Sequence, residues 1–205
     1  MELETKFNSK RTFFIGCAFF TIMLLWQVYN YMCPLFLEEI GISDTYKGAI
    51  MAADNIFALI MLPIFGNLSD KTKTKLGKRM PYIIVGTILA ALTFPFIAAF
   101  GIKKNLIGLI ISMGLILFFM NIYRAPAVAL MPDLTPKEHR SKANGIINLM
   151  GGIGGIFAYG TTFLFGSKYP IIPFLTASIL MVVALTILLT TIKEAKLVPE
   201  IEESP

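Results

Sequence analysis

Two charged residues, Asp54 and Arg124, lie inside otherwise apolar stretches of this sequence. A charged side chain at the centre of a membrane helix costs about 2.5–3.5 kcal/mol on insertion scales, so it is usually retained for a function. The planar donor fork of Arg124 suits a ligand rich in hydroxyl groups, although it could instead satisfy backbone carbonyls near Pro126. Asp54 could carry a proton or help to hold Na⁺, or it could be a hydrogen-bonded partner in helix packing.

Polar and aromatic residues at helical spacing accompany these charges. Tyr29 and Asn30 lie three and four residues after Trp26, which places all three on one helical face. An aromatic platform beside an amide suits a sugar, whose ring has an apolar face and a rim of hydroxyls. Packing or lipid-facing aromatics are the alternative. Asn121, one turn before Arg124, and Asn148 are further candidates for substrate binding, and packing is an equal alternative for Asn148.

The elements that must position these residues are six long apolar stretches. Of the 205 residues 56% are hydrophobic, and the mean hydropathy is +0.72, too apolar for a soluble domain. Each stretch exceeds the roughly 20 residues that a helix needs to cross a bilayer, and far exceeds a β-barrel strand. The sequence therefore predicts an all-α membrane protein with six transmembrane helices. Their expected ranges are 12–37, 48–69, 80–102, 105–132, 143–167 and 169–192, followed by a polar tail or linker over 193–205.

Several other classes of protein are excluded by the same pattern. The net charge of +5 is confined to loops beside the spans, where anionic lipid and not nucleic acid is the nearer partner. The spans hold no His/Glu/Asp or Ser/Lys constellation, so we do not expect an enzyme. No CxxC pair indicates a metal site, and no cofactor is expected. The glycine run 151–155 indicates close helix packing and not a phosphate-binding loop.

A cluster of glycines and charges follows the second stretch: Gly66 and Asp70, then Gly77, Lys78 and Arg79. It resembles the loop signature of the major facilitator superfamily, GxxxD(K/R)xG(K/R)(K/R), with extra residues before the second glycine. The longer form is similar to the glycoside–pentoside–hexuronide carriers and the sucrose-type symporters. In the family this cluster forms a cytoplasmic gate. Gly66 would allow another helix to approach closely, and Asp70 would accept hydrogen bonds.

The segment from Tyr123, near the end of the fourth stretch, through Asp133 to Arg140 resembles the second cytoplasmic loop of the same group. Asp133 and Arg140 are therefore expected to join the gate. The resemblance covers nearly the whole chain but only the first half of a twelve-span carrier. It implies alternating access around a central site completed by a second six-helix half, supplied by a C-terminal half, by a separate chain or by a second copy of this one.

The resemblance implies cation-coupled transport of a sugar or glycoside, with a proton or Na⁺ as the coupling ion. One departure is that plant sucrose carriers have an acid near the position of Leu117, and this chain has none in that span. Coupling would then depend on Asp54 or on the second half. A carrier of the same fold for a non-sugar solute, or a non-transporting six-span scaffold or sensor, remains an alternative.

The loop before the fifth stretch contains a helix start signal. Thr135, Pro136 and Glu138 have the spacing of a capping box with proline at the first helical position, so we expect a helix to begin there.

The loop charges predict the orientation. The side that holds both termini has 13 Lys and Arg residues and the opposite side has 4. Under the positive-inside rule both termini lie in the cytoplasm of a cell whose plasma (inner) membrane this chain spans.

Labelling of single cysteines in intact cells tests this orientation. We expect an impermeant reagent to modify Lys104→Cys and to leave Ser204→Cys protected, because the two positions would face opposite sides of the membrane. The reverse pattern would invert the topology.

Overall fold

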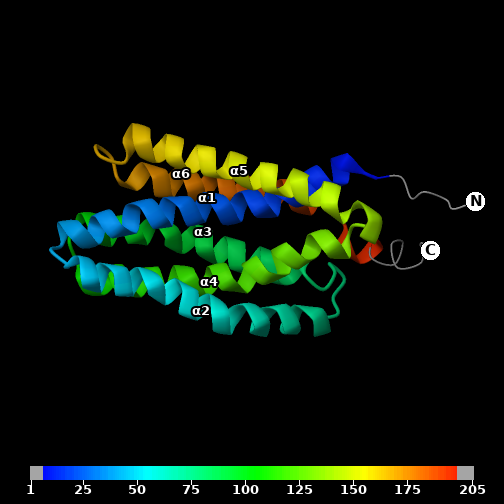
Figure 1. Ribbon diagram of the computed structural model, residues 1–205, viewed down its shortest axis with the longest axis horizontal. Coiled ribbons are helices and arrows are strands. Elements are labelled where there is room, and N and C mark those ends of the chain that lie inside the picture. The colour runs from blue at the N-terminus through cyan, green and yellow to red at the C-terminus, as the bar shows by residue number, and fades with distance from the viewer. Residues whose placement is uncertain (1–6, 198–205) are drawn as a thin grey trace, which may run out of the picture.

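The computed structural model describes residues 7–197, which form six long α-helices and one short 3₁₀ turn (Figure 1). Each long helix is apolar enough to cross a membrane, and each agrees with a predicted stretch to within about one turn. The predicted all-α membrane fold is therefore confirmed. The helices are α1 (Ser9–Glu39), α2 (Asp44–Lys71), α3 (Met80–Ile102), α4 (Leu106–Asp133), α5 (Arg140–Phe165) and α6 (Ile171–Thr191), with the turn η1 (Lys137–His139) before α5.

The helices pack as two interlocked sets of three. α1 packs mainly against α5 and α6, α4 packs mainly against α2 and α3, and α3 also contacts α6. Exchanging α1 with α4, α2 with α5 and α3 with α6 leaves this set of main contacts unchanged. Because α1 and α4 run in opposite directions along the bundle (Figure 1), the two sets are inverted three-helix repeats. No strong repeat is visible in the sequence, so this symmetry belongs to the fold.

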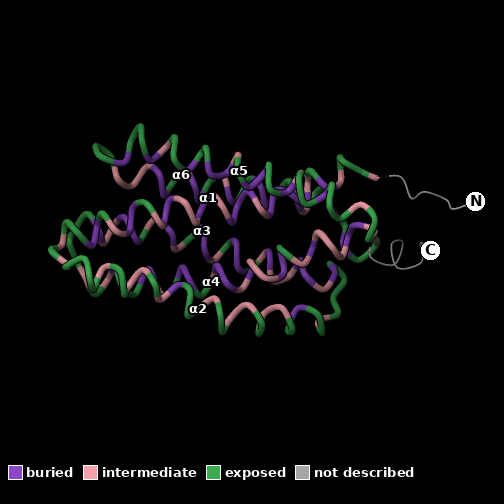
Figure 2. Tube along the Cα trace, viewed as in Figure 1, coloured by how far each residue is buried: buried purple, intermediate pink, exposed green. Residues whose placement is uncertain are grey.

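On α2 polar side chains are buried and large apolar side chains are exposed, which is the reverse of a surface helix in a soluble protein. The buried residues of α2 are the polar pair Asp54 and Ser69, whereas Leu59 and Ile56 are 78% and 62% exposed. Figure 2 shows the contrast between the exposed α2 and the central α1, which is buried along most of its length. This pattern is stable only where the surrounding solvent is apolar, as in a bilayer.

Glycine sets the distance between α1 and α5. A Cβ on Gly154 would lie 2.6 Å from the backbone oxygen of Phe20, too close for any other residue without a shift of backbone. The prediction that the glycine run serves helix packing is therefore confirmed at this position.

The predicted capping box is wrong. The Thr135 hydroxyl is buried and has no hydrogen-bond partner among the described residues, so it does not cap a helix. A 3₁₀ turn begins at Lys137, with Pro136 before it, and the α-helix begins only at Arg140.

The segment after α6 is packed, where a polar tail was expected. Glu194 is fully buried, and Leu197 packs against the core. The expectation that packing ends at Lys193 is therefore wrong for these residues. Residues 198–205 lie outside the described range, so a linker there stays a prediction.

Candidate functional site

Arg79 is the centre of a polar cluster at the end of the bundle where α2 and α4 end and α3 begins. Its buried guanidinium donates to the Asp133 carboxylate over 2.9 Å, to the Gly66 carbonyl over 3.2 Å, and to Ser69 and Asp70. We call these five residues the Arg79 cluster. Charge-assisted bonds of this kind are about twice as strong as neutral ones, so one side chain joins three helix ends.

Glu194 binds the backbone next to the Arg79 cluster, at the start of α3. Its carboxylate accepts the backbone N–H groups of Lys78, Arg79 and Met80, at 2.9–3.1 Å. These are donors at the start of α3 that no turn of the helix can satisfy. Gly77 is required beside them, because its φ is +114° and a Cβ there would overlap the Glu194 carboxylate.

Glu194 was not among the predicted site residues. Its contacts join positions 114 to 116 residues apart, which no local pattern reveals. One signal was available: Glu194 is the first acid after the sixth span, and it emerges at the same membrane face as Arg79.

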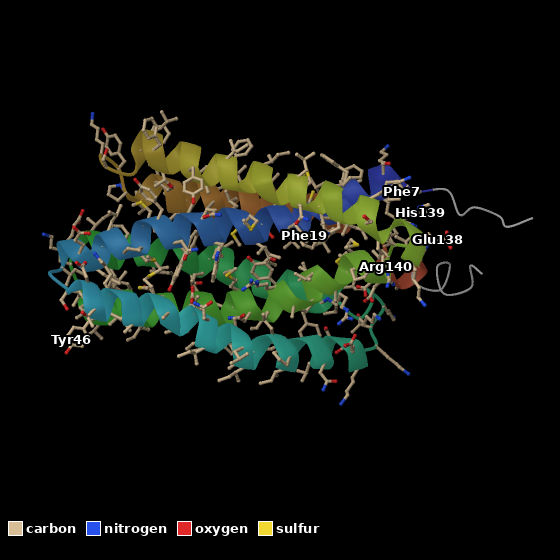
Figure 3. The ribbon with its side chains drawn as sticks, viewed as in Figure 1. Phe7, Phe19, Tyr46, Glu138, His139 and Arg140 are labelled. Carbon is tan, nitrogen blue, oxygen red and sulfur yellow. The ribbon has the colours of Figure 1, made fainter. Side chains whose placement is uncertain are left out.

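Arg140 does not join the Arg79 cluster, contrary to the expectation. Its guanidinium donates to the carbonyl of Pro132 in the last turn of α4, at 2.9 Å, and to the carbonyl of Thr135 just past that helix, at 3.3 Å. Figure 3 shows Arg140 beside Glu138 and His139 at the end of the bundle. A cation is favourable there because the C-terminal end of a helix carries a partial negative charge. The Asp133 carboxylate instead binds Arg79 and, at 3.2 Å, Lys78.

Deep in the bundle, Trp26, Tyr29 and Arg124 form a stack between α1 and α4. The Arg124 guanidinium lies 5.3 Å from the Trp26 ring centre, and the Trp26 and Tyr29 rings are stacked at 6.2 Å. Within residues 7–197 Arg124 makes no hydrogen bond or ion pair, so it does not satisfy carbonyls near Pro126. Its N–H donors are left available for a ligand or a partner.

Three buried polar atoms near the stack also lack partners among the described residues. They are the Tyr29 hydroxyl, one carboxylate oxygen of Asp54 and the Asn121 side-chain oxygen, from α1, α2 and α4. Asn121 uses its nitrogen to bond the Leu117 carbonyl at 2.8 Å. Most buried polar groups in proteins are bonded, so these exceptions need an explanation, as do the unbonded hydroxyls of Thr87, Tyr123 and Ser178. Asp54 and Arg124 form no ion pair with each other in the part of the chain described.

Other predicted residues are not brought into this stack by any contact. Asn30 is half-buried on α1, and Asn148 is exposed on α5. Gln27 and Tyr31 face α5, where both contact Tyr159: its hydroxyl donates to Gln27 over 2.9 Å, and its ring packs edge-on against Tyr31.

Comparison of the sequence with family profiles identifies the family of this chain. The profile described as Major Facilitator Superfamily matches residues 15–205. The chain belongs to the major facilitator superfamily. Six helices, inverted three-helix repeats and a charged loop after the second helix are therefore features of a superfamily member.

Known members that resemble this chain are named for sugar transport. The sucrose transport protein SUC3 of Arabidopsis thaliana is 28% identical over 88% of this chain and 36% of the relative. SUC4 of the same plant is 23% identical over 66% of this chain and 30% of the relative. A lactose permease of Lactobacillus helveticus is 29% identical over 59% of this chain and 20% of the relative. The chain spans about a third of the length of the sucrose transport proteins that it matches.

Glu194→Ala should destabilise this major facilitator chain by about 2–3 kcal/mol, because buried N–H donors at the start of α3 would lose a charged acceptor. Lys196→Ala, an exposed change in the same segment, is the matched control and should leave stability within about 0.5 kcal/mol of the parent. Unfolding in mixed micelles, followed by circular dichroism, measures both. Equal midpoints for the two variants would contradict the role given to Glu194.

Proposed function

We propose that this chain is the amino-terminal half of a secondary active transporter for a sugar or glycoside, and not an enzyme. The observation that carries the proposal is Arg124, which lies over the Trp26 ring in a membrane helix with its donors unbonded. A sugar matches both features, since its apolar face fits an aromatic ring and its hydroxyls accept from a guanidinium. The names of the similar transport proteins support the same class of substrate.

Substrate binding is assigned to the stack and its surroundings: Trp26, Tyr29, Asn121 and Arg124, with Asn30 and Asn148 reaching the same cavity in the complete transporter. Asn121 and Tyr29 each have an unbonded buried oxygen that a hydroxyl group could satisfy.

Coupling is assigned to Asp54. It is the acid that α2 buries, and one of its oxygens has no partner in the described residues. A carboxylate in this position is unfavourable until it gains a proton or a cation, which couples its occupation by H⁺ or Na⁺ to the state of the site. Because no ion pair ties Asp54 to Arg124, each is free to bind its own ligand.

The Arg79 cluster, with Gly77 and Glu194, is assigned to the cytoplasmic gate. Arg79, at the start of α3, binds the ends of α2 and α4. A conformation that separates these helix ends must therefore break several charge-assisted hydrogen bonds together. Cooperative breaking of that kind suits a switch between two states. This assignment places both termini on the cytoplasmic side of the plasma membrane, in agreement with the charge of the loops.

A second six-helix half is the expected partner. On α5, Asn144, Gly145, Asn148 and Gly152 share one exposed face, where a Cβ on either glycine would meet nothing within 4 Å. Lipid alone is a poor cover for amides, and small residues let another helix come close. On α2 a Cβ on Gly66 would also meet nothing within 4 Å. Another helix was expected to approach closely at this glycine, and no helix of the described residues does so. A helix of the second half would fill both places.

Arg124→Lys should reduce sugar uptake at least about tenfold although it keeps the charge, because lysine lacks the planar donor fork. The matched control is Arg11→Lys, the same change at the start of α1, which should transport like the parent. Uptake is measured in liposomes that hold this chain with a second half, and with this chain alone as the blank. If Arg124→Lys retains uptake within about twofold at equal expression, Arg124 has no part in binding the sugar.

Asp54→Asn should abolish accumulation of sugar against its gradient and leave exchange of labelled for unlabelled sugar, because the amide can bind sugar-facing groups but cannot take up H⁺ or Na⁺. Asp44→Asn, an exposed acid at the start of the same helix, is the control and should still accumulate sugar. Uphill accumulation by Asp54→Asn would remove the coupling role from this residue.

A further inference from the structure

A hollow of about 400 Å³ lies where α1 begins and α6 ends. Figure 1 shows these two helix ends at the same end of the bundle. The lining includes Lys10 and Arg11 on one side and Phe14, Ile192 and Leu197 on the other. The hollow is separate from the Arg79 cluster and from the Trp26 and Arg124 stack, and neither of those sites uses its residues.

The charge that the described residues bring to this hollow is positive. Lys10 and Arg11 form no ion pair within residues 7–197, and no carboxylate is among the lining residues. The larger hollow beside residues 72–78 is different, because the carboxylates of Asp70 and Glu194 lie in its wall. The two cations at the start of α1 thus line a hollow that has no carboxylate among its described lining residues.

Apolar side chains line the hollow beside these charges. The apolar stretch of α1 starts directly after Arg11, and Ile192 directly follows the last residue of α6. Phe14 and Leu197 are partly buried against the core, and Ile192 is buried in it. An occupant would thus meet cations at the first turn of α1, the Phe14 ring one turn further along α1, and the Ile192 side chain at the end of α6.

We propose that this hollow is a binding site for an anionic phospholipid, with the headgroup phosphate at Lys10 and Arg11 and the start of an acyl chain along Phe14 and Ile192. A soluble phosphate would use only the charged half of the hollow. The lipid uses both halves, and its position at the ends of two membrane helices makes it the anion present at the highest local concentration.

Native mass spectrometry of the purified 205-residue chain in neutral detergent tests the site with three probes: phosphatidylglycerol, phosphatidylcholine and glycerol 1-phosphate. We expect one saturable phosphatidylglycerol, and weaker binding of the other two. Each basic residue near an anionic lipid is worth about fivefold in affinity, so the double variant Lys10→Gln/Arg11→Gln should lose about thirtyfold.

The matched control is Lys73→Gln/Lys75→Gln, which removes the same charge from exposed lysines of the 72–78 segment and should bind phosphatidylglycerol within about twofold of the parent. The charge-preserving double variant Lys10→Arg/Arg11→Lys should also bind like the parent, which separates loss of charge from loss of fold. Equal loss in the control, no preference for phosphatidylglycerol over phosphatidylcholine, or a charge-preserving variant that fails to bind would each overturn the site. Glycerol 1-phosphate bound as tightly as the lipid would assign the hollow to a soluble phosphate instead.

Discussion

Hydrocarbon forms no hydrogen bonds, so each polar group that enters the membrane must find its partner within the protein. Several hydroxyl groups in the helices meet this constraint within their own helix. Thr93 donates to the Leu89 carbonyl and Thr186 to the Val182 carbonyl, each one turn earlier in its own helix. The same constraint makes α2 bury Asp54 and Ser69 and leave its aliphatic side chains to the lipid. The rest of the structure can be understood from where the constraint is met and where it is not.

It is met most fully at the end of the bundle around Arg79. The four contacts of the guanidinium go to two other helices, α2 and α4, while the Glu194 carboxylate accepts backbone N–H groups at the start of α3. It is not met around Arg124, Asp54 and Tyr29, whose polar atoms are left without partners in the described chain. A saturated cluster resists change, and an unsaturated one gains stability from a ligand. The two sites thus have opposite properties, which suit the gate and the binding site that we propose.

The sequence predicts the parts of this arrangement that depend on short spacing. Hydropathy alone locates the six helices, because span length and apolarity are set by the bilayer. The stacking of Trp26 on Tyr29 follows from helical spacing. The contacts of Glu194 do not, since they join segments more than 100 residues apart. Thr135 shows the opposite error: a local capping pattern was present, but tertiary burial of its hydroxyl prevented the hydrogen bond.

The symmetry of the fold connects these local features to a larger assembly. Because exchange of the two three-helix sets preserves their main contacts, α2 and α5 take equivalent places beside the central pair α4 and α1. Both carry exposed polar or small residues that lipid covers poorly: Asn55 on α2, and Asn144, Asn148 and Gly152 on α5. The same two helices also flank α1 and α4, which carry Trp26 and Arg124. A partner that covers α2 and α5 would therefore also close the open side of the binding site, so the unmet hydrogen bonds of the interior and the uncovered amides of the surface would be satisfied by one assembly.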